Sequence, residues 1–297
     1  MDLKQGRLIR AIGGFFDVYV CPGEVYRCQI KGKLKQKNKG ETYISVGDMV
    51  EFSLDAHGQG IIEDILPRDN YLQRPEVANV SQLISVISAR KPFPDWNLLS
   101  RQLVAAESNG IKSLICLNKK DLVANNELEE ITEILKMYPY EVVISSALTG
   151  EGMEKVKETL EGHISVFSGS SGVGKSSLIN AIKPDLDLET GEVSEKGKRG
   201  RHTTRRVEIL PLNEGMIVDT PGFSKLDLSG EEMDCPDIYF PEMQPYRAYC
   251  KFRDCYHKDE PNCAVKKAVE DGFISEMRYQ HYLSFLREME NSDKKRM

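Results

Sequence analysis

A phosphate-binding loop is the feature of this sequence that most restricts how the chain can fold. The pattern G-x-x-x-x-G-K-[ST] is matched by Gly169-Ser170-Ser171-Gly172-Val173-Gly174-Lys175-Ser176. Such a loop works between a buried strand and a helix, because its N–H groups and the helix N-terminus together surround a phosphate. An apolar strand pattern at His163–Phe167 and a helical pattern at Lys175–Ile182 provide that setting. The sequence therefore predicts an α/β unit with a largely parallel, doubly wound sheet.

The residues at the end of this loop have separate expected roles. Lys175 is expected to bridge the β- and γ-phosphates, and Ser176 is expected to ligate Mg²⁺. Ser177 is included in the same predicted nucleotide site. The alternative is a glycine- and serine-rich loop that binds nothing, and the strand–loop–helix setting argues against it.

A second motif, Asn118-Lys119-Lys120-Asp121, fits N-K-x-D and follows an apolar strand. The Asp121 carboxylate can accept hydrogen bonds from N1–H and N2–H₂ of guanine, a donor pair that adenine lacks. We expect the stem of Lys119 to pack on the base and Asn118 to bind the phosphate loop. Ser145-Ser146-Ala147 ends the next strand, where we expect a backbone N–H near guanine O6. Either segment alone could be a solvated surface loop, but together at consecutive strand ends they indicate a guanine nucleotide.

Two further segments complete the expected nucleotide site. Asp219-Thr220-Pro221-Gly222 fits D-x-x-G, so we expect Asp219 to hold Mg²⁺ through water and the Gly222 N–H to face the γ-phosphate. The alternative there is a simple strand-end turn. Between the motifs lies a basic, glycine-containing segment typical of a mobile switch, in which Thr203 or Thr204 completes the Mg²⁺ shell; we assign Thr204.

Phe223 stands where many GTPases have a glutamine that orients the attacking water. Phenylalanine cannot orient water, so another group must do so. His202, in the predicted switch, is the candidate, because imidazole can orient or deprotonate water near neutral pH. The alternative is that His202 contacts RNA phosphate among its basic neighbours.

The motifs stand in an unusual order. The guanine-reading segment precedes the phosphate loop, whereas ordinary GTPases have the reverse, so the sequence predicts a circular permutation. A helix near residues 153–160 would join the original ends. The new ends fall just after D-x-x-G, and nucleotide state is therefore expected to reposition the domains attached there.

The flanking regions predict two further domains, with divisions at 1–68, 69–228 and 229–297. Residues 1–68 contain five short strand patterns and no long helical period, which favours an OB-fold barrel over a β-sandwich fragment. After residue 229, prolines interrupt the chain before a helical tail. There Cys250, Cys255, His257 and Cys263 form a compact set typical of one structural zinc ion. Cys235 and His281 are possible substitutes outside the compact spacing.

Charge and composition limit the partners. Hydrophobic residues make up 40% of the 297, and the net charge is −6, so nucleic-acid binding must come from local patches. No apolar run spans a membrane and no signal-peptide pattern opens the chain, so we expect a cytoplasmic monomer without membrane contact. One basic run alone is usually a solvated loop, but basic runs in the barrel, in the switch segment and in the helical tail together favour a large polyanion. The lysines of the predicted barrel loop are the expected RNA contacts. They are Lys31, Lys33, Lys35, Lys37 and Lys39.

The chain closely resembles the RsgA (YjeQ) family of circularly permuted bacterial GTPases, through the motif order, Gly200-Arg201-His202-Thr203-Thr204 and the Cys-Cys-His-Cys spacing. The resemblance covers nearly the whole chain. It implies an OB-fold, a permuted GTPase core and a zinc domain. It also implies GTP hydrolysis stimulated by the small ribosomal subunit, late in the maturation of that subunit, with rRNA contacts by the outer domains and with His202 as a catalytic candidate.

Two other functions stay open at this point. One is an RNA-binding assembly scaffold that uses GTP binding as a clamp with negligible turnover, which the absent glutamine leaves possible. The other is a P-loop ATPase or small-molecule kinase, against which Asp121 argues.

Overall fold

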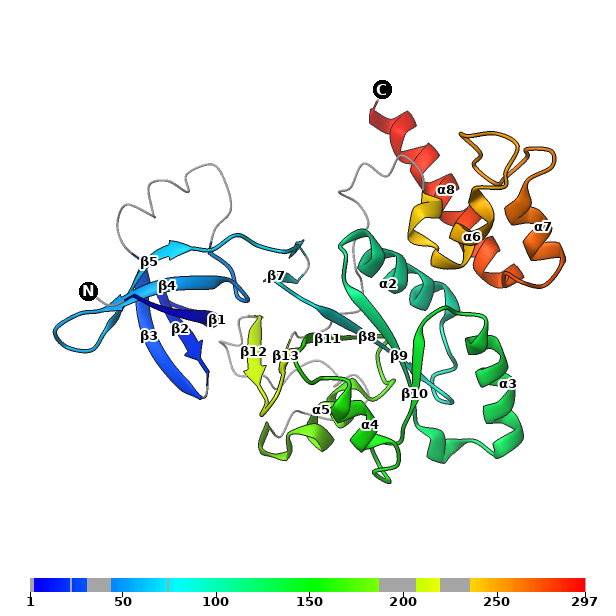
Figure 1. The fold of residues 1–297 in the computed structure, drawn as a ribbon. Coiled ribbons are helices and arrows are strands. Elements are labelled where there is room, and N and C mark those ends of the chain that lie inside the picture. Colours follow the sequence, from blue (N-terminus) through cyan, green and yellow to red (C-terminus); the bar gives the residue numbers. More distant parts are fainter. Residues whose placement is uncertain are drawn as a thin grey trace.

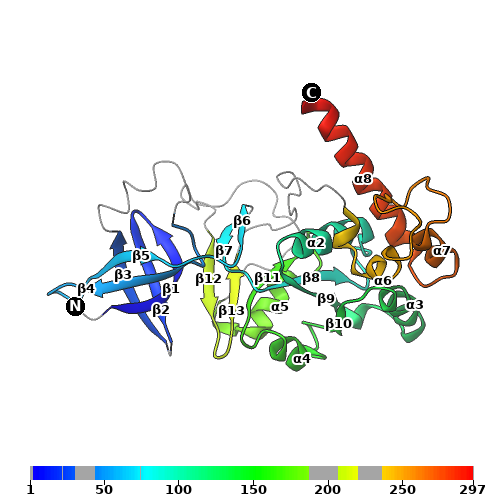
Figure 2. The ribbon, with the colours of Figure 1, turned by 45° about the horizontal axis from the view of Figure 1, so that its top comes forward.

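The computed structural model describes residues 3–21, 23–30, 44–73, 75–186, 207–219 and 236–296. Along the chain these residues form a small barrel, an open sheet with helices, and a helical C-terminal lobe that begins at residue 236 (Figure 1). Figure 2 shows the three parts in a row, with the sheet between the barrel and the lobe.

The N-terminal part is a closed five-stranded barrel of order β1-β2-β3-β5-β4. All pairs are antiparallel except β3 with β5, and the pairing of β4 with β1 closes the barrel. Alternating burial places residues such as Leu8, Val18 and Phe52 inside. The predicted barrel is confirmed, with the strands β1 (Lys4–Ile12), β2 (Phe15–Val20), β3 (Glu24–Ile30), β4 (Met49–Leu54) and β5 (Gly60–Ile65).

The central part is a six-stranded sheet of order β10-β9-β8-β11-β13-β12. Every neighbouring pair is parallel except β12 with β13, which form a hairpin at one edge. The middle strands are buried along their whole length, as parallel strands covered on both faces must be. The strands are β8 (Gln82–Ser88), β9 (Lys112–Asn118), β10 (Glu141–Ile144), β11 (Ile164–Ser168), β12 (Glu208–Pro211) and β13 (Met216–Asp219).

Four helices connect these strands, and two of them, α4 and α5, lie where the sequence predicted helices near residues 153–160 and at Lys175–Ile182. Helix α2 begins at the N-cap Asp95, whose side chain accepts a hydrogen bond from the Leu98 N–H. Helix α5 begins directly after the phosphate loop. The helices are α2 (Trp96–Ser108), α3 (Asn125–Lys136), α4 (Met153–Glu158) and α5 (Lys175–Ile182), with short 3₁₀ turns η1 (Lys120–Leu122) and η2 (Pro184–Leu186).

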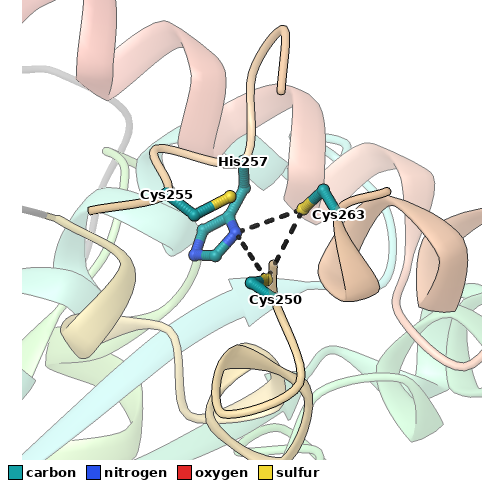
Figure 3. A group of neighbouring side chains, drawn as sticks. All are labelled: Cys250, Cys255, His257 and Cys263. Carbon is teal, nitrogen blue, oxygen red and sulfur yellow. Dashed lines mark hydrogen bonds between the residues drawn. The ribbon is translucent and has the colours of Figure 1, made fainter. Parts of the chain in front are cut away.

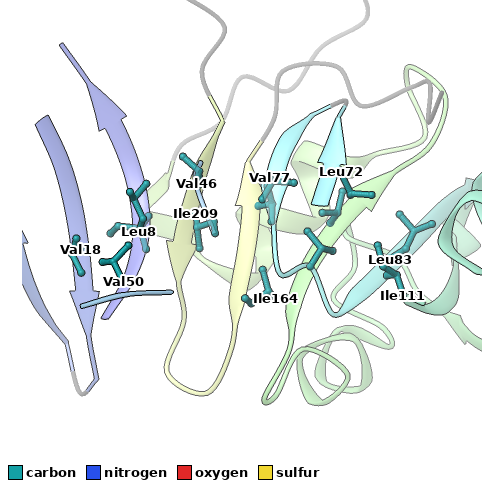
Figure 4. Close-up of a cluster of buried hydrophobic side chains, with 14 of the residues drawn as sticks. Leu8, Val18, Val46, Val50, Leu72, Val77, Leu83, Ile111, Ile164 and Ile209 are labelled. Atoms are coloured by element: carbon teal, nitrogen blue, oxygen red, sulfur yellow. The ribbon is translucent and has the colours of Figure 1, made fainter. Parts of the chain in front are cut away.

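A small hairpin joins the barrel to the sheet and was not expected from the sequence. Its strands, β6 (Tyr71–Gln73) and β7 (Glu76–Ala78), are too short to show a hydrophobic period. One buried apolar cluster runs from the barrel residue Leu8 through Val77 of the hairpin to Ile209 and Ile164 of the sheet (Figure 4). The apolar core is therefore continuous from the barrel through the hairpin to the sheet.

The C-terminal lobe packs on α2 through its last helix. Its elements are η3 (Pro236–Tyr239), η4 (Pro241–Met243), α6 (Gln244–Arg247), α7 (Ala264–Glu270) and α8 (Glu276–Arg296). Val104 of α2 belongs to the same buried cluster as Phe240, Tyr282 and Phe285 of the lobe. Among the described helices, none combines the length and the apolar content that a membrane crossing requires. The divisions after residues 68 and 228 stay predictions.

Gly47 is expected to be the backbone position on which the junction between barrel and hairpin depends. Its φ is +95°, and a Cβ there would lie 2.0 Å from the Ala78 carbonyl oxygen. We expect Gly47→Ala to lower the free energy of unfolding by about 2–5 kcal/mol, from left-handed strain and from the clash together.

The matched control is Gly58→Ala, because Gly58 has a similar φ of +78° but nothing within 4 Å of its Cβ position. The free energy of unfolding of Gly58→Ala should fall only by the cost of the left-handed conformation, about 1–2 kcal/mol. Denaturant and thermal unfolding of both variants measure the difference, and equal losses would show that the close approach to Ala78 is relaxed at little cost.

Candidate nucleotide site and metal centre

The predicted nucleotide motifs meet at one edge of the sheet. Strands β10, β9, β8 and β11 are parallel neighbours, so their carboxyl ends lie side by side. The phosphate loop follows β11, Asn118 ends β9, and Ser145 directly follows β10. Ligands of open parallel sheets bind at this edge, so the motif order along the chain does not prevent a single site.

The phosphate loop can take its shape only because two of its glycines lack side chains. Gly169 has a φ of +154°, and a Cβ there would lie 2.2 Å from the Val86 carbonyl oxygen. Gly174 has a φ of +98°, and a Cβ there would lie 2.3 Å from the Asn118 amide nitrogen. The loop is therefore pressed against β8 on one side and against the guanine-reading segment on the other.

Lys175 points back into its own loop. Its Nζ donates hydrogen bonds to the carbonyl oxygens of Gly169 at 2.8 Å and Ser170 at 2.9 Å. Burial lowers the pKa of the Lys175 amine, because few solvent molecules surround the charge. The ammonium group is thus held inside the curve of the phosphate loop by carbonyl oxygens of that loop.

Asn118 joins the three loops of the site. Its side chain is 1% exposed. The amide nitrogen donates to the Val173 carbonyl oxygen at 2.9 Å, and the amide oxygen accepts a hydrogen bond from the Ala147 N–H at 3.1 Å. One side chain therefore sets the spacing between the phosphate loop and the loop that follows β10.

Lys119 and Asp121 lie on the exposed side of this framework. Lys119 adopts a left-handed conformation with φ of +63°, and its Nζ donates to the carbonyl oxygens of Gly172 at 2.5 Å and Lys91 at 2.6 Å. Asp121 is exposed and accepts a hydrogen bond from the hydroxyl of the buried Ser146 at 2.5 Å. The Ser146 hydroxyl orients the Asp121 carboxylate, which remains accessible to a ligand.

The sequence reasoning missed one contact beneath the phosphate loop. Gln102 of α2 is 1% exposed, and its amide nitrogen donates to the hydroxyl of Ser168 at 2.7 Å. Ser168 directly precedes Gly169, so α2 is attached to the start of the loop. A glutamine within an amphipathic helix gives no signal of such a role, since only packing turns it toward the sheet.

The remaining predicted nucleotide residues include Asp219, Ser176 and Ser177, which lie in described elements. Asp219 ends β13, which pairs with β11 in parallel, so its backbone lies beside the strand that leads into the phosphate loop. His202, Thr203, Thr204, Gly222 and Phe223 lie outside the described residues, as do the lysines of 31–39. Ser176 and Ser177 lie in the first turn of α5.

The predicted metal ligands Cys250, Cys255, His257 and Cys263 come together in the C-terminal lobe (Figure 3). Their donor atoms all lie within 4.8 Å of one another. His257 Nδ1 is 3.5 Å from Cys250 Sγ and 3.3 Å from Cys263 Sγ, and the two sulfurs are 3.8 Å apart.

A tetrahedral ion with bonds of about 2.3 Å to sulfur and about 2.0 Å to nitrogen spaces its ligands about 3.5–3.8 Å apart. The measured separations fit such an ion.

The surroundings of the three thiols shift their pKa values away from that of a free cysteine. Burial raises the pKa of Cys255 to about 12 and also raises that of Cys263. Although burial opposes its ionisation too, N–H groups of Val265 and Ala264 lower the pKa of Cys250. A divalent cation would favour the thiolate at all three, since metal-bound thiols are deprotonated.

The substitutes considered for the metal set do not join it within the described residues. His281 lies on α8, where its Nδ1 is 2.7 Å from the Ser100 hydroxyl of α2, and burial lowers its pKa. Its role is to connect the lobe with α2. Cys235 lies outside the described residues.

Comparison with known proteins gives matches over both of the first two parts. The family model described as RsgA GTPase matches residues 65–229, and that described as RsgA N-terminal domain matches residues 5–62. A relative from Moorella thermoacetica, named small ribosomal subunit biogenesis GTPase RsgA, is 46% identical over 96% of this chain and 97% of its own. A relative of the same name from Caldanaerobacter subterraneus subsp. tengcongensis is 43% identical over 100% of this chain and 99% of its own.

Solved structures agree with these matches. The crystal structure of YjeQ from Thermotoga maritima superposes with a TM-score of 0.85 at 37% identity, over 97% of this chain and 98% of that one. YloQ, described as a circularly permuted GTPase, superposes with a TM-score of 0.82 at 32% identity, over 98% of this chain and 96% of that one. The predicted circular permutation is confirmed.

Asp121→Asn is expected to change the base preference of the site. An amide keeps the acceptor that Ser146 uses but replaces the second acceptor by a donor, so guanine loses a charge-assisted hydrogen bond. We expect GDP affinity to fall about 100-fold and affinity for xanthosine diphosphate to rise, as measured by titration of each nucleotide. Asp64→Asn, at an exposed barrel carboxylate, is the control, and equal GDP binding in both variants would contradict the role of Asp121.

Removal of metal is expected to destabilise the C-terminal lobe. A ligand that binds only the folded state contributes about 4 kcal/mol at a free concentration about 1,000 times its Kd. We therefore expect a strong chelator to lower the Tm of the protein and Cys255→Ser to remove most of that response. Cys21→Ser, at an exposed barrel cysteine, should respond to the chelator as the unaltered protein does. A Tm unchanged by chelation would argue against a bound metal.

Proposed function

This chain belongs to the RsgA family of GTPases, and we propose that it hydrolyses GTP to control its own binding to the small ribosomal subunit during late maturation of that subunit. The observation that carries the proposal is the match of both family models together with near full-length relatives named for small-subunit biogenesis. A GTPase of this family acts on ribosomes, which assemble in the cytoplasm, so we propose that location. We also propose that the chain is a monomer.

The guanine base is proposed to lie against Asn118–Asp121. Asp121 would accept from N1–H and N2–H₂, while the stem of Lys119 covers one face of the ring. The buried Asn118 supports this assignment, since it connects the base-reading segment with the phosphate loop and with Ala147. An N–H of Ser145, Ser146 or Ala147 would then face guanine O6.

The phosphates are proposed to lie over Gly169–Ser177. N–H groups of the loop and Lys175 would hold the β- and γ-phosphates, and the lysine would exchange its two carbonyl partners for phosphate oxygens. Ser176, Thr204 and, through water, Asp219 would hold Mg²⁺, which neutralises charge on the phosphate oxygens when bound. The Gly222 N–H would face the γ-phosphate, and Thr203 would lie beside it.

We assign the orientation of the attacking water to His202, because Phe223 cannot accept or donate a proton at the position where glutamine is common. An imidazole near neutral pH can accept a hydrogen bond from water in its neutral form. The competing assignment for His202 is a contact with RNA phosphate.

The outer parts of the chain are proposed to contact rRNA. Lys31, Lys33, Lys35, Lys37 and Lys39 give the barrel a loop of one charge sign, and polyanion binding by barrel loops is common. The metal set is proposed to hold one structural zinc ion, since three thiolates and one imidazole leave no position open for chemistry.

The permuted order gives the barrel a route to the nucleotide. β12 lies in the chain between the predicted switch that holds Thr203 and Thr204 and the D-x-x-G motif at Asp219–Gly222, and it contacts β1. Nε of Arg10 on β1 lies 3.6 Å from a carboxylate oxygen of Glu208 on β12. A conformational change in the segments on either side of β12 would therefore alter the contact between β12 and β1 of the barrel. Nucleotide state is proposed to change the barrel arrangement, and an identical arrangement with GDP and a GTP analogue would contradict that.

The decisive measurement is turnover of GTP and ATP with and without small ribosomal subunits. We expect turnover selective for GTP and strongly raised by the subunits. Turnover that subunits do not raise would favour the alternative function, an rRNA-binding scaffold in which GTP is only a clamp.

His202→Ala is expected to keep GTP binding and lose subunit-stimulated turnover by about 10²–10⁴-fold, the range of a general base. His57→Ala, at an exposed barrel turn, serves as the control. If His202→Ala instead weakens binding to the subunit while turnover of the bound protein is unchanged, the RNA-contact assignment holds.

A further inference from the structure

A buried carboxylate stands behind the imidazole of the metal set. Asp237 on η3 is fully buried, and its Oδ2 lies 3.3 Å from Nε2 of His257. The same oxygen accepts a hydrogen bond from Nε of Arg247 at 2.6 Å. The carboxylate, the imidazole and the guanidinium come from three separate segments of the C-terminal lobe.

The two nitrogens of His257 face different partners. Nδ1 lies toward the sulfurs of Cys250 and Cys263, as Figure 3 shows, at 3.5 and 3.3 Å. A metal held by these thiolates would take the lone pair of Nδ1. A neutral imidazole that donates this lone pair carries its proton on the other nitrogen, and that nitrogen faces Asp237.

We propose that Asp237 is the positioning residue of the metal centre. It accepts the Nε2 proton of His257, which fixes the tautomer and the ring orientation and makes Nδ1 the stronger donor. The inference rests on the proposed metal site but not on GTP hydrolysis. It assigns a function to a residue that carries no metal-ligand signal in the sequence, because the residue lies outside the compact ligand spacing.

Charge balance supports an ionised Asp237. Burying a carboxylate without a partner is costly, and Arg247 supplies the compensating positive charge at hydrogen-bond distance. The Asp237 peptide group is also held, since its carbonyl oxygen accepts from the Gln244 side chain at 2.7 Å and from the Phe240 N–H at 3.0 Å. The peptide contacts fix the backbone of Asp237, and the Arg247 contact holds its carboxylate beside the ring.

The ligand loop is also held by α8. The hydroxyl of Tyr279 donates to the carbonyl oxygen of His257, and that of Tyr282 donates to the carbonyl oxygen of Tyr256, both at 2.6 Å. Burial raises the pKa of Tyr279 to about 12, so it stays a neutral donor. With the backbone of His257 fixed by α8, the ring contact with Asp237 attaches η3, the first element of the lobe, to the metal loop.

The test compares Asp237→Asn with a matched buried carboxylate in the same lobe. Glu242 is 2.6 Å from Nε of the buried Arg278 and contacts none of the metal ligands among the described contacts, so Glu242→Gln removes an equivalent charge elsewhere. Zinc affinity of each full-length protein is measured by competition with a chromogenic chelator. We expect Asp237→Asn to bind zinc 10- to 100-fold more weakly and Glu242→Gln to stay within about two-fold of the unaltered protein.

Cobalt gives a second readout that a merely structural role would not change. The Co²⁺-loaded Asp237→Asn protein is expected to show shifted d–d and thiolate charge-transfer bands, because the donor strength and orientation of His257 change. Glu242→Gln should keep the spectrum of the unaltered protein. Asp237→Asn preserves the side-chain volume, so the comparison does not depend on a large deletion.

Three outcomes would overturn the inference. Asp237→Asn could bind zinc and cobalt as the unaltered protein does, or both variants could lose affinity equally, which would indicate general destabilisation of the lobe. Failure of the unaltered protein to bind zinc would instead remove the metal site itself. GTP turnover is independent of both measurements, so the proposed enzymatic function is tested separately.

Discussion

The Asn118 side chain is the contact on which the nucleotide end of this molecule depends. Buried between the phosphate loop and the loop after β10, it satisfies the Val173 carbonyl oxygen and the Ala147 N–H with one amide. A buried amide that lost either partner would leave a polar group unpaired, at a cost of about 1–3 kcal/mol. The contact joins residues that are far apart in the chain but adjacent at the sheet edge. For this reason the permuted order leaves the site intact.

Helix α2 links that edge to the C-terminal lobe. Gln102 contacts Ser168 beneath the phosphate loop, while Ser100 contacts His281 and Arg101 pairs with Glu288 of α8 at 3.0 Å. The buried guanidinium of Arg278 strengthens the same junction.

Arg278 of α8 pairs with Glu242 and lies 5.1 Å from the ring centre of Tyr138 and 4.5 Å from that of Phe240. Tyr138 follows α3 and Phe240 belongs to the lobe, so the guanidinium is clamped between the two parts. These polar contacts attach the lobe to the GTPase part of the chain, and they form only when the lobe is in this position relative to α2 and Tyr138.

Agreement between sequence and structure is best where the signal is local. The barrel strands and α5 follow from short residue patterns, and the metal set follows from ligand spacing over a few residues. The β6–β7 hairpin was not expected, since three-residue strands carry no period. Gln102 and Asp237 were also missed, because their roles depend on partners brought near only by packing.

The residue types and spacings alone were sufficient to indicate the phosphate loop, the guanine-reading segment, the permuted order and the metal ligands. These depend on short stretches of chain whose chemistry is local. The fold was needed to show that Asn118 spans three loops, that a common apolar cluster joins barrel and sheet, and that Asp237 stands behind His257. Each of those contacts joins residues distant in the sequence, and their approach is set by the burial of apolar surface, which no short pattern encodes.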